Sequence, residues 1–279
     1  MIMYSEEELK LLIKENSWGI ISTSGQELSE EFMEKYADHI WWNDLLDHQE
    51  IPERIIKKYV KKFNLKKIFM EKKMSEWFIE KYANQKYGPN YWNEVFVYQE
   101  LSEEFIKRHI SHVNWTKLIK EHYVSEEFIE KYADKIDFNK IAEYQKLSES
   151  FIEKYKDRLN WKDIIEHQEL SESFIEKHQD RLEWQYIFIY QRLSKEFITK
   201  YQDRVEDWNL ISWNQKLPEE LIIKYQDKID WLCISQQQEL SEEFIEKYHH
   251  KLNWIALKRC NPYIEFNEKI ESYYKLYTL

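Results

Sequence analysis

The sequence contains few of the residues that build turns, disulfides or membrane spans. Three Gly and four Pro among 279 residues are far below ordinary usage, so few tight turns can form. The two cysteines, Cys233 and Cys260, indicate no disulfide framework and favour a reducing compartment. No stretch approaches the roughly 18 apolar residues of a membrane helix, and glutamates occupy the N-terminal region where a secretory signal is apolar. We therefore expect a soluble, cytoplasmic chain.

Net positive charge and catalytic motifs are also missing. A net charge of −11 makes nucleic acid an unfavourable partner, because phosphate binding needs a basic face. No P-loop, GxSxG, HExxH or Gly-rich dinucleotide motif occurs. His109 and His112 have a spacing that suits metal ligands on a helix. In the sequence repeat described below, however, His109 occupies a position that is usually Tyr and His122 a position that is usually Gln. Both substitutions favour structural roles. We predict no enzyme activity, metal site or cofactor.

Aromatic residues are abundant, and they recur in a repeat of 23 residues. Residues 147–169 (LSESFIEKYKDRLNWKDIIEHQE) and 170–192 (LSESFIEKHQDRLEWQYIFIYQR) are nearly the same. An insertion around NQKYGPN (84–90) lengthens the third copy, and one residue near Glu206–Asp207 lengthens the eighth. We predict a degenerate half-repeat at 1–27, ten copies over 28–263 and a C-terminal cap at 264–279. The copies begin at Leu28, Ile51, Met74, Leu101, Val124, Leu147, Leu170, Leu193, Leu217 and Leu240.

Each copy encodes two short helices of about ten residues. A Ser or Pro follows the first residue and suits a helix N-terminus, and carboxylates after it complement the helix dipole. An Asn or Asp usually caps the second helix, which starts with an aromatic residue and ends at a Gln. Helices this short are unstable alone and must bury their apolar faces on the next pair. The fold class predicted is therefore all-α, an α-solenoid of about ten stacked two-helix repeats with degenerate terminal caps.

Two columns of the repeat are interpreted as structural. Leu65 and Phe138 replace the Trp that starts the second helix, and this purely apolar exchange indicates a core position rather than a stacking platform. We expect the Gln column to satisfy helix ends and turns between copies. The Trp column is Trp42, Trp92, Trp115, Trp161, Trp184, Trp208, Trp231 and Trp254, and the Gln column is Gln49, Gln99, Gln145, Gln168, Gln191, Gln215 and Gln238.

The motif itself resembles a known group of sequences. LSEEFIEKY at 240–248 and VSEEFIEKYADKI at 124–136, followed by an aromatic residue and a Gln, resemble the short helical tandem repeats of uncharacterised proteins from large DNA viruses and phages. The resemblance covers nearly the whole chain. It implies a helical-repeat fold and a viral origin, which would place the chain in the host cytoplasm, and it brings no catalytic motif.

Basic side chains form two stripes along the first helices. In six copies a Glu stands four residues before the first Lys, which predicts pairs within one helix such as Glu127–Lys131 and Glu243–Lys247 and hence a solvated surface. Ser150 and Ser173 replace this Glu in the sixth and seventh copies. We therefore expect a less neutralised patch there, as a second candidate binding site, made of Lys154, Arg158, Lys177 and Arg181.

The second copy departs most from the pattern. Residues 51–73 hold eight Lys and one Arg against two Glu, and the insertion follows in the next copy. Such an interruption is where a binding loop is often placed, so this region is a candidate site for anions or a protein. The alternative is a positive patch that offsets acidic neighbours. The candidates are Lys57, Lys58, Lys61 and Lys62 on the first helix, Lys66 and Lys67 on the second, and Lys86 and Tyr87 in the insertion.

The residue before the Gln varies between copies and gives a third candidate surface, including Tyr144, His167 and Tyr190. Three functions remain open. The preferred one is a scaffold that binds a partner protein, as a viral inhibitor of a host defence if the resemblance holds. The second is a sponge for a small anionic nucleotide-like signalling molecule. The third is a self-assembling structural protein, built by stacking of terminal repeats.

Overall fold

The computed structural model describes residues 4–83 and 90–278, and these residues form an all-helical α-solenoid of two-helix repeats. They contain 23 α-helices, three single-turn 3₁₀ helices and no strand. Among these residues, no helix has the length and apolar content needed to cross a membrane. The chain divides into two compact units, Met1–Ile136 and Asp137–Leu279, so the boundary falls between the two helices of the fifth copy.

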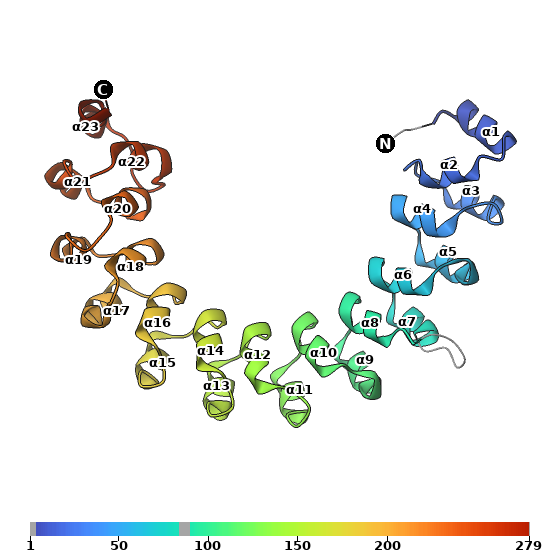
Figure 1. Ribbon diagram of the computed structural model, residues 1–279, viewed down its shortest axis with the longest axis horizontal. Helices are drawn as coiled ribbons and strands as arrows, with labels where there is room; N and C mark the ends of the chain where they lie inside the picture. Colours follow the sequence, from blue (N-terminus) through green and yellow to red (C-terminus); the bar gives the residue numbers. More distant parts are fainter. Residues whose placement is uncertain (1–3, 84–89, 279) are drawn as a thin grey trace. The chain divides into compact units, whose positions relative to one another are not determined.

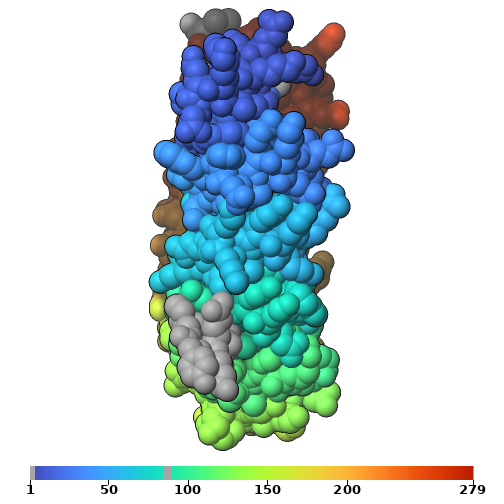
Figure 2. Space-filling view, turned by 90° about the vertical axis from the view of Figure 1, so that its right-hand side faces the viewer, coloured from blue at the N-terminus to red at the C-terminus, as the bar shows by residue number. Residues whose placement is uncertain are grey.

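In the first unit, first and second helices alternate and form two rows (Figure 1). The second helices pack on one another, as α8 does on both α6 and α10. Figure 2 shows successive copies of this unit as stacked bands in chain order, from blue to green. The first row holds α1 (Glu6–Lys14), α3 (Glu30–Lys35), α5 (Glu53–Lys58), α7 (Glu76–Tyr82), α9 (Glu103–Arg108) and α11 (Glu126–Lys131). The second holds α2 (Trp18–Thr23), α4 (Trp42–His48), α6 (Leu65–Glu71), α8 (Trp92–Tyr98) and α10 (Trp115–Glu121), with 3₁₀ turns η1 (Val60–Lys62) and η2 (Ile110–His112) between rows.

The second unit repeats this arrangement. Each second helix packs on the next, from α12 through α22, and α23 packs on α21 and α22 at the end of the row. The second helices are α12 (Phe138–Tyr144), α14 (Trp161–His167), α16 (Trp184–Tyr190), α18 (Trp208–Asn214), α20 (Trp231–Gln237) and α22 (Trp254–Cys260). The first row holds α13 (Glu149–Tyr155), α15 (Glu172–Lys177), α17 (Lys195–Lys200), α19 (Glu219–Lys224), α21 (Glu242–Tyr248) and the capping α23 (Glu268–Thr278), with η3 (Gln202–Arg204) after α17.

The helix starts confirm the predicted caps. The Ser125 hydroxyl accepts a hydrogen bond of 3.1 Å from the Phe128 amide, and the same bond recurs in every copy that has this Ser. Asn160 caps α14 by accepting from the Lys162 amide at 3.0 Å. Each cap satisfies an amide that has no partner within the helix.

The helix lengths differ from the expectation. Helices of the ten copies have six or seven residues rather than about ten, because the residue in the Tyr column ends or closely follows the first helix, as Tyr132 does with φ −115°. A turn or a 3₁₀ helix then leads to the next cap. As a result Lys61 and Lys62 lie in η1 rather than on α5. The N-terminal segment also differs, since α1 and α2 make a complete helix pair rather than a half-repeat.

The Trp column lies in the core, as predicted. Trp42, Trp92, Trp208 and Trp254 are each 3% exposed, and the other members are partly buried against the aromatic residues of the next copy. The Trp161 indole N–H donates to the Lys156 carbonyl at 2.9 Å, which satisfies its one polar atom. The column is therefore unavailable as a stacking surface for bases or sugars.

The Gln column forms the predicted ladder between copies. The buried Gln168 amide donates to the carbonyls of Ala142 and Gln145, both at 2.7 Å, and its oxygen accepts from the Leu147 amide at 2.8 Å. These bonds satisfy the last carbonyls of α12 and the turn that follows it. The same three bonds recur at Gln99, Gln191, Gln215 and Gln238.

Candidate binding surfaces

The basic second copy lies against a strongly acidic first copy. Residues 28–50 contain seven carboxylates and one Lys. Lys58 pairs with Glu34 at 2.8 Å and Lys62 with Asp38 at 2.6 Å. Further pairs from the second copy to the first are Lys67–Asp47, Lys72–Glu50 and Arg54–Glu30. The hydrogen bond from Lys62 lowers the pKa of Asp38, and that from Lys67 lowers the pKa of Asp47. Most of the positive charge of this copy therefore neutralises its neighbour.

Three of the remaining candidates in this copy have other environments. Lys66 turns to the third copy and pairs with Glu94 at 3.2 Å. The Lys57 ammonium lies 3.9 Å from the centre of the exposed Trp77 ring, in a cation–π contact. Lys61 has no ion pair within the described part of the chain. Lys86 and Tyr87 lie outside the described residues. Lys57 and Lys61 are thus the lysines of the second copy that are least engaged in pairing.

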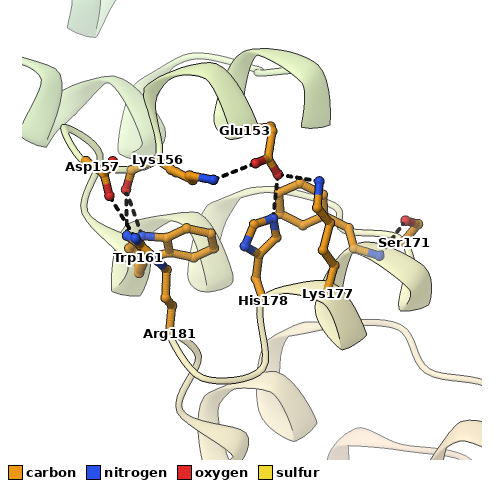
Figure 3. A network of polar contacts seen from close by, with 9 residues as sticks. Glu153, Lys156, Asp157, Trp161, Ser171, Lys177, His178 and Arg181 are labelled. Carbon is orange, nitrogen blue, oxygen red and sulfur yellow. Dashed lines mark hydrogen bonds and ion pairs between the residues drawn. The ribbon is translucent and has the colours of Figure 1, made fainter.

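Two of the four mid-chain bases, Lys177 and Arg181, are paired with the preceding copy (Figure 3). Lys177 lies 2.8 Å from Glu153, and Arg181 lies 2.8 Å from Asp157, so the expected lack of neutralisation is wrong for these two residues. The Arg158 guanidinium packs 3.7 Å from the centre of the Phe138 ring. The Lys154 ammonium lies 5.3 Å from the centre of the neighbouring tyrosine ring. The binding role of these four bases stays a prediction.

Ion pairing follows a rule that the sequence interpretation missed. In three copies the Lys at the end of the first helix pairs with the Glu that lies 24 residues earlier, as in Lys58–Glu34 at 2.8 Å, Lys177–Glu153 at 2.8 Å and Lys200–Glu176 at 2.7 Å. The expected pairs within one helix, Glu127–Lys131 and Glu243–Lys247, do not form in the described structure. The acids that would match Lys131 and Lys247 in the preceding copy are replaced by Lys107 and Ile223. At this position charge joins neighbouring copies, whereas other pairs, such as Glu103–Lys107 at 2.9 Å, lie within one helix.

Glu153 is the centre of the network in Figure 3. Its carboxylate accepts from Lys156 at 2.7 Å, from Lys177 at 2.8 Å and contacts the His178 ring at 2.7 Å. The hydrogen bonds from Lys156 and Lys177 lower the pKa of Glu153 to about 2. Both oxygens of this carboxylate are engaged by the protein itself, which favours a structural role.

This network predicts a defined acid sensitivity. A carboxyl whose pKa falls on folding stabilises the protein above its unfolded pKa, and that contribution is lost as the pH drops toward its folded pKa. For Glu153 the loss occurs below its ordinary value of 4.5 and is complete near pH 2. The range from about pH 5 to about pH 2 covers the titration of Glu153. Between these two pH values the melting temperature of Glu153→Gln should therefore fall less than that of the native chain. Equal slopes of melting temperature against pH for both proteins would contradict this assignment.

The third candidate surface is exposed on the second helices. Tyr144 is 39% and Tyr190 is 48% exposed, and His167 occupies the same place in the copy between them. Tyr144 and His167 line an open groove of about 440 Å³ at the ends of α12 and α14. Glu143 and Glu169 also line it, and a hydrogen bond from Tyr144 to Glu143 raises the pKa of that tyrosine. Two carboxylates against one lysine, Lys146, in the lining make the groove a poor site for an anion.

Three neighbouring second helices form a surface that the sequence interpretation did not identify. In a chain that is 33% charged, α16 (WQYIFIY), α18 (WNLISWN) and α20 (WLCISQQ) contain no charged residue. Their solvent side carries Tyr190, Trp213 and Leu232, which are 48%, 47% and 39% exposed. The absence of charge is visible in the letters. The exposure of these helix faces cannot be read from the sequence, because a fully buried helix is also uncharged.

The histidines near the insertion gather around Trp92. The His109 and His112 rings lie 4.6 Å and 4.7 Å from the Trp92 ring, and burial lowers the pKa of His109. The Trp92 indole N–H and His109 Nε2 are buried without a hydrogen bond. The buried His122 replaces Gln in the ladder and contacts the Phe96 carbonyl at 3.0 Å. Across the described residues no group of three or more His, Cys, Asp or Glu is placed to hold a metal ion.

Together these features define a helical-repeat protein whose Trp and Gln columns are used internally and whose variable residues face solvent. No protein-family model, curated protein or solved structure matches this chain.

Proposed function

We propose that this chain is a non-enzymatic scaffold that binds a partner protein through the variable, solvent-facing side of its second helices. The observation that carries this proposal is the exposure of Tyr190 and Trp213 on neighbouring, uncharged helices. Aromatic side chains supply much of the energy of protein interfaces, and charged residues are depleted at interface centres. The viral resemblance of the repeat extends the proposal to a host defence protein as the partner.

The division between frame and surface supports a binding role. Gln and Trp columns hold successive copies together, while the residues between them differ from copy to copy. A repeat protein of this type keeps one frame and changes its exposed residues to fit a partner. Six of the eight lysines of the second copy are paired with carboxylates of the neighbouring copies, so the second helices are favoured over the lysines as the binding site.

The proposal is tested by affinity capture with two matched double variants. The purified chain is exposed to cell lysate, washed and heat-denatured, and both released fractions are analysed by mass spectrometry. We expect the native chain and the Lys57→Glu/Lys61→Glu variant to capture one protein in stoichiometric amount. The Tyr190→Ala/Trp213→Ala variant should no longer capture it. All four residues have side chains at the surface, so either variant should keep the fold.

Each other outcome would point to a different function. Loss of the protein with the lysine variant alone would move the site to the second copy. A nucleotide-like compound in the heated supernatant would contradict the scaffold and indicate sequestration. No captured molecule, together with a mass that rises with concentration in light scattering, would indicate self-assembly.

A further inference from the structure

The fourth copy, residues 101–123, has histidine at three positions where the other copies rarely have it. His109 stands where eight copies have Tyr, His112 where seven copies have Lys or Arg, and His122 where seven copies have Gln. No other copy has His at more than one of these positions. Because His is the side chain that ordinarily titrates near neutral pH, the contacts of this copy differ from those of its neighbours in their response to acid.

All three rings lie against the third copy. The centres of the His109 and His112 rings are 4.6 Å and 4.7 Å from that of the Trp92 ring, and His112 is nearly parallel to it. His122 follows α10 and is 8% exposed, and its Nε2 lies 3.0 Å from the carbonyl of Phe96 in α8. Since α8 and α10 pack on each other, the contact between these two copies contains three titratable rings.

Protonation of His122 conflicts with its place in the Gln ladder. A carbonyl only accepts, so the neutral ring donates from Nε2 to Phe96 and keeps Nδ1 without a proton. A second proton would place a full charge in a site with little access to water. Burial is the largest effect and lowers the pKa of His122. The bond to Phe96 and the charge of Glu121 act against this, and the charge of Lys73 adds to it.

His109 is subject to the same effect. Its side chain is 16% exposed, and its Nε2 has no hydrogen bond, although a carboxylate oxygen of Glu80 in α7 lies 3.5 Å away. Burial is again the largest effect and lowers the pKa of His109. The charges of Arg108 and His112 add to this, and that of Glu80 opposes it. Glu80 also lies 3.5 Å from the Arg108 guanidinium, so its charge is shared between two partners.

We propose that the contact between the third and fourth copies is an acid-sensitive joint, which His109 and His122 keep closed when neutral and open when protonated. Opening exposes both rings to water, where they take up protons at the ordinary pKa of 6.5. The closed joint binds these protons less readily than the open one. It is therefore most stable above 6.5 and weakens as the pH falls below that value.

The repeat itself supplies the variants for the test. His109→Tyr and His122→Gln each restore the residue that most copies carry, so the double variant His109→Tyr/His122→Gln should keep the fold. Hydrogen exchange of the full chain is measured by NMR at about pH 7.5 and about pH 5.5 and corrected for intrinsic rates. The amide of Leu118, which donates to Asn114 within α10, reports on the joint, and that of Leu45 in α4 is the reference in the same unit.

In the native chain, we expect the protection of Leu118 relative to Leu45 to fall at the lower pH. Roughly one pH unit below 6.5, a ring that is neutral only in the closed joint weakens it by up to about tenfold. The double variant should show no such fall. The matched control is His167→Tyr, which replaces a histidine of the other unit by the residue that Tyr144 and Tyr190 represent in the adjacent copies, and it should keep the full effect.

Three results would overturn the joint. The first is an equal fall at Leu118 in the native chain and the double variant. The second is an equal fall at Leu118 and Leu45 in the native chain, which would indicate general acid unfolding. The third is a gain in protection at the lower pH, which would show that charged His109 binds Glu80 across the two copies. None of these bears on the proposed scaffold, because Tyr190 and Trp213 lie in the other unit.

Discussion

Replacing Trp208 by Ala is expected to lower the free energy of unfolding by about 3–5 kcal/mol. Trp208 is 3% exposed, and its ring stacks on Tyr225 with centres 3.8 Å apart. The replacement would remove a large side chain from a contact between two copies and leave a cavity there. Because each copy is stabilised by its neighbours, loss at one position weakens the whole row of copies in that unit.

The same helix provides the matched control for this prediction. Trp213 lies five residues further along α18 but is 47% exposed, so Trp213→Ala is expected to cost less than about 1 kcal/mol. Denaturant unfolding followed by circular dichroism measures both variants without relying on tryptophan fluorescence. Equal losses in the two variants would contradict the division of α18 into a frame side and a recognition side.

Replacing Gln238 by Leu is expected to cost at least about 3 kcal/mol, because it leaves three buried backbone groups unpaired. Gln238 is 1% exposed, and its amide donates to the carbonyls of Ser212 and Gln215 at 2.7 and 2.8 Å. Its oxygen accepts from the Leu217 amide at 2.8 Å. Leucine has a similar size but no polar atom, so the change removes hydrogen bonds with little change in volume.

The neighbouring Gln237 is the control for the ladder. It lies on the solvent side of α20, and its side chain has no hydrogen bond within the described structure. Gln237→Leu should change the denaturation midpoint little, typically by less than about 0.5 kcal/mol in free energy. Hydrogen exchange adds a local measurement, since the Leu217 amide should lose protection in Gln238→Leu and keep it in Gln237→Leu. Unchanged exchange at Leu217 in both variants would contradict the ladder.

The sequence predicted the frame of this protein well. The Ser and Asn caps, the Trp core column and the Gln ladder all lie where their spacing placed them. Local chemistry explains this success. A cap binds an amide two or three residues away, and an apolar residue that recurs at every period must meet its equivalent in the next copy.

The charged columns were predicted less well, because their partners come from stacking rather than from the helix itself. Glu and Lys four residues apart on one helix suggested local pairs. In the structure, Lys177 meets Glu153 of the preceding copy, and the basic second copy meets the acidic first. The prediction of the candidate site was limited for the same reason, because exposure also depends on how the copies stack. Tyr190 was identified from its variability, whereas Trp213 and Leu232 were missed because their exposure depends on which helix faces are packed.

The sequence by itself therefore determined the repeat, the helix starts, and the residues that form the core and the ladder. These features depend on interactions within one copy or on the strict period between copies. Tertiary structure alone decided which charges pair, where each first helix ends, and which uncharged helix faces remain in solvent. Those features depend on the geometry with which one copy packs on the next, and no single copy specifies that geometry.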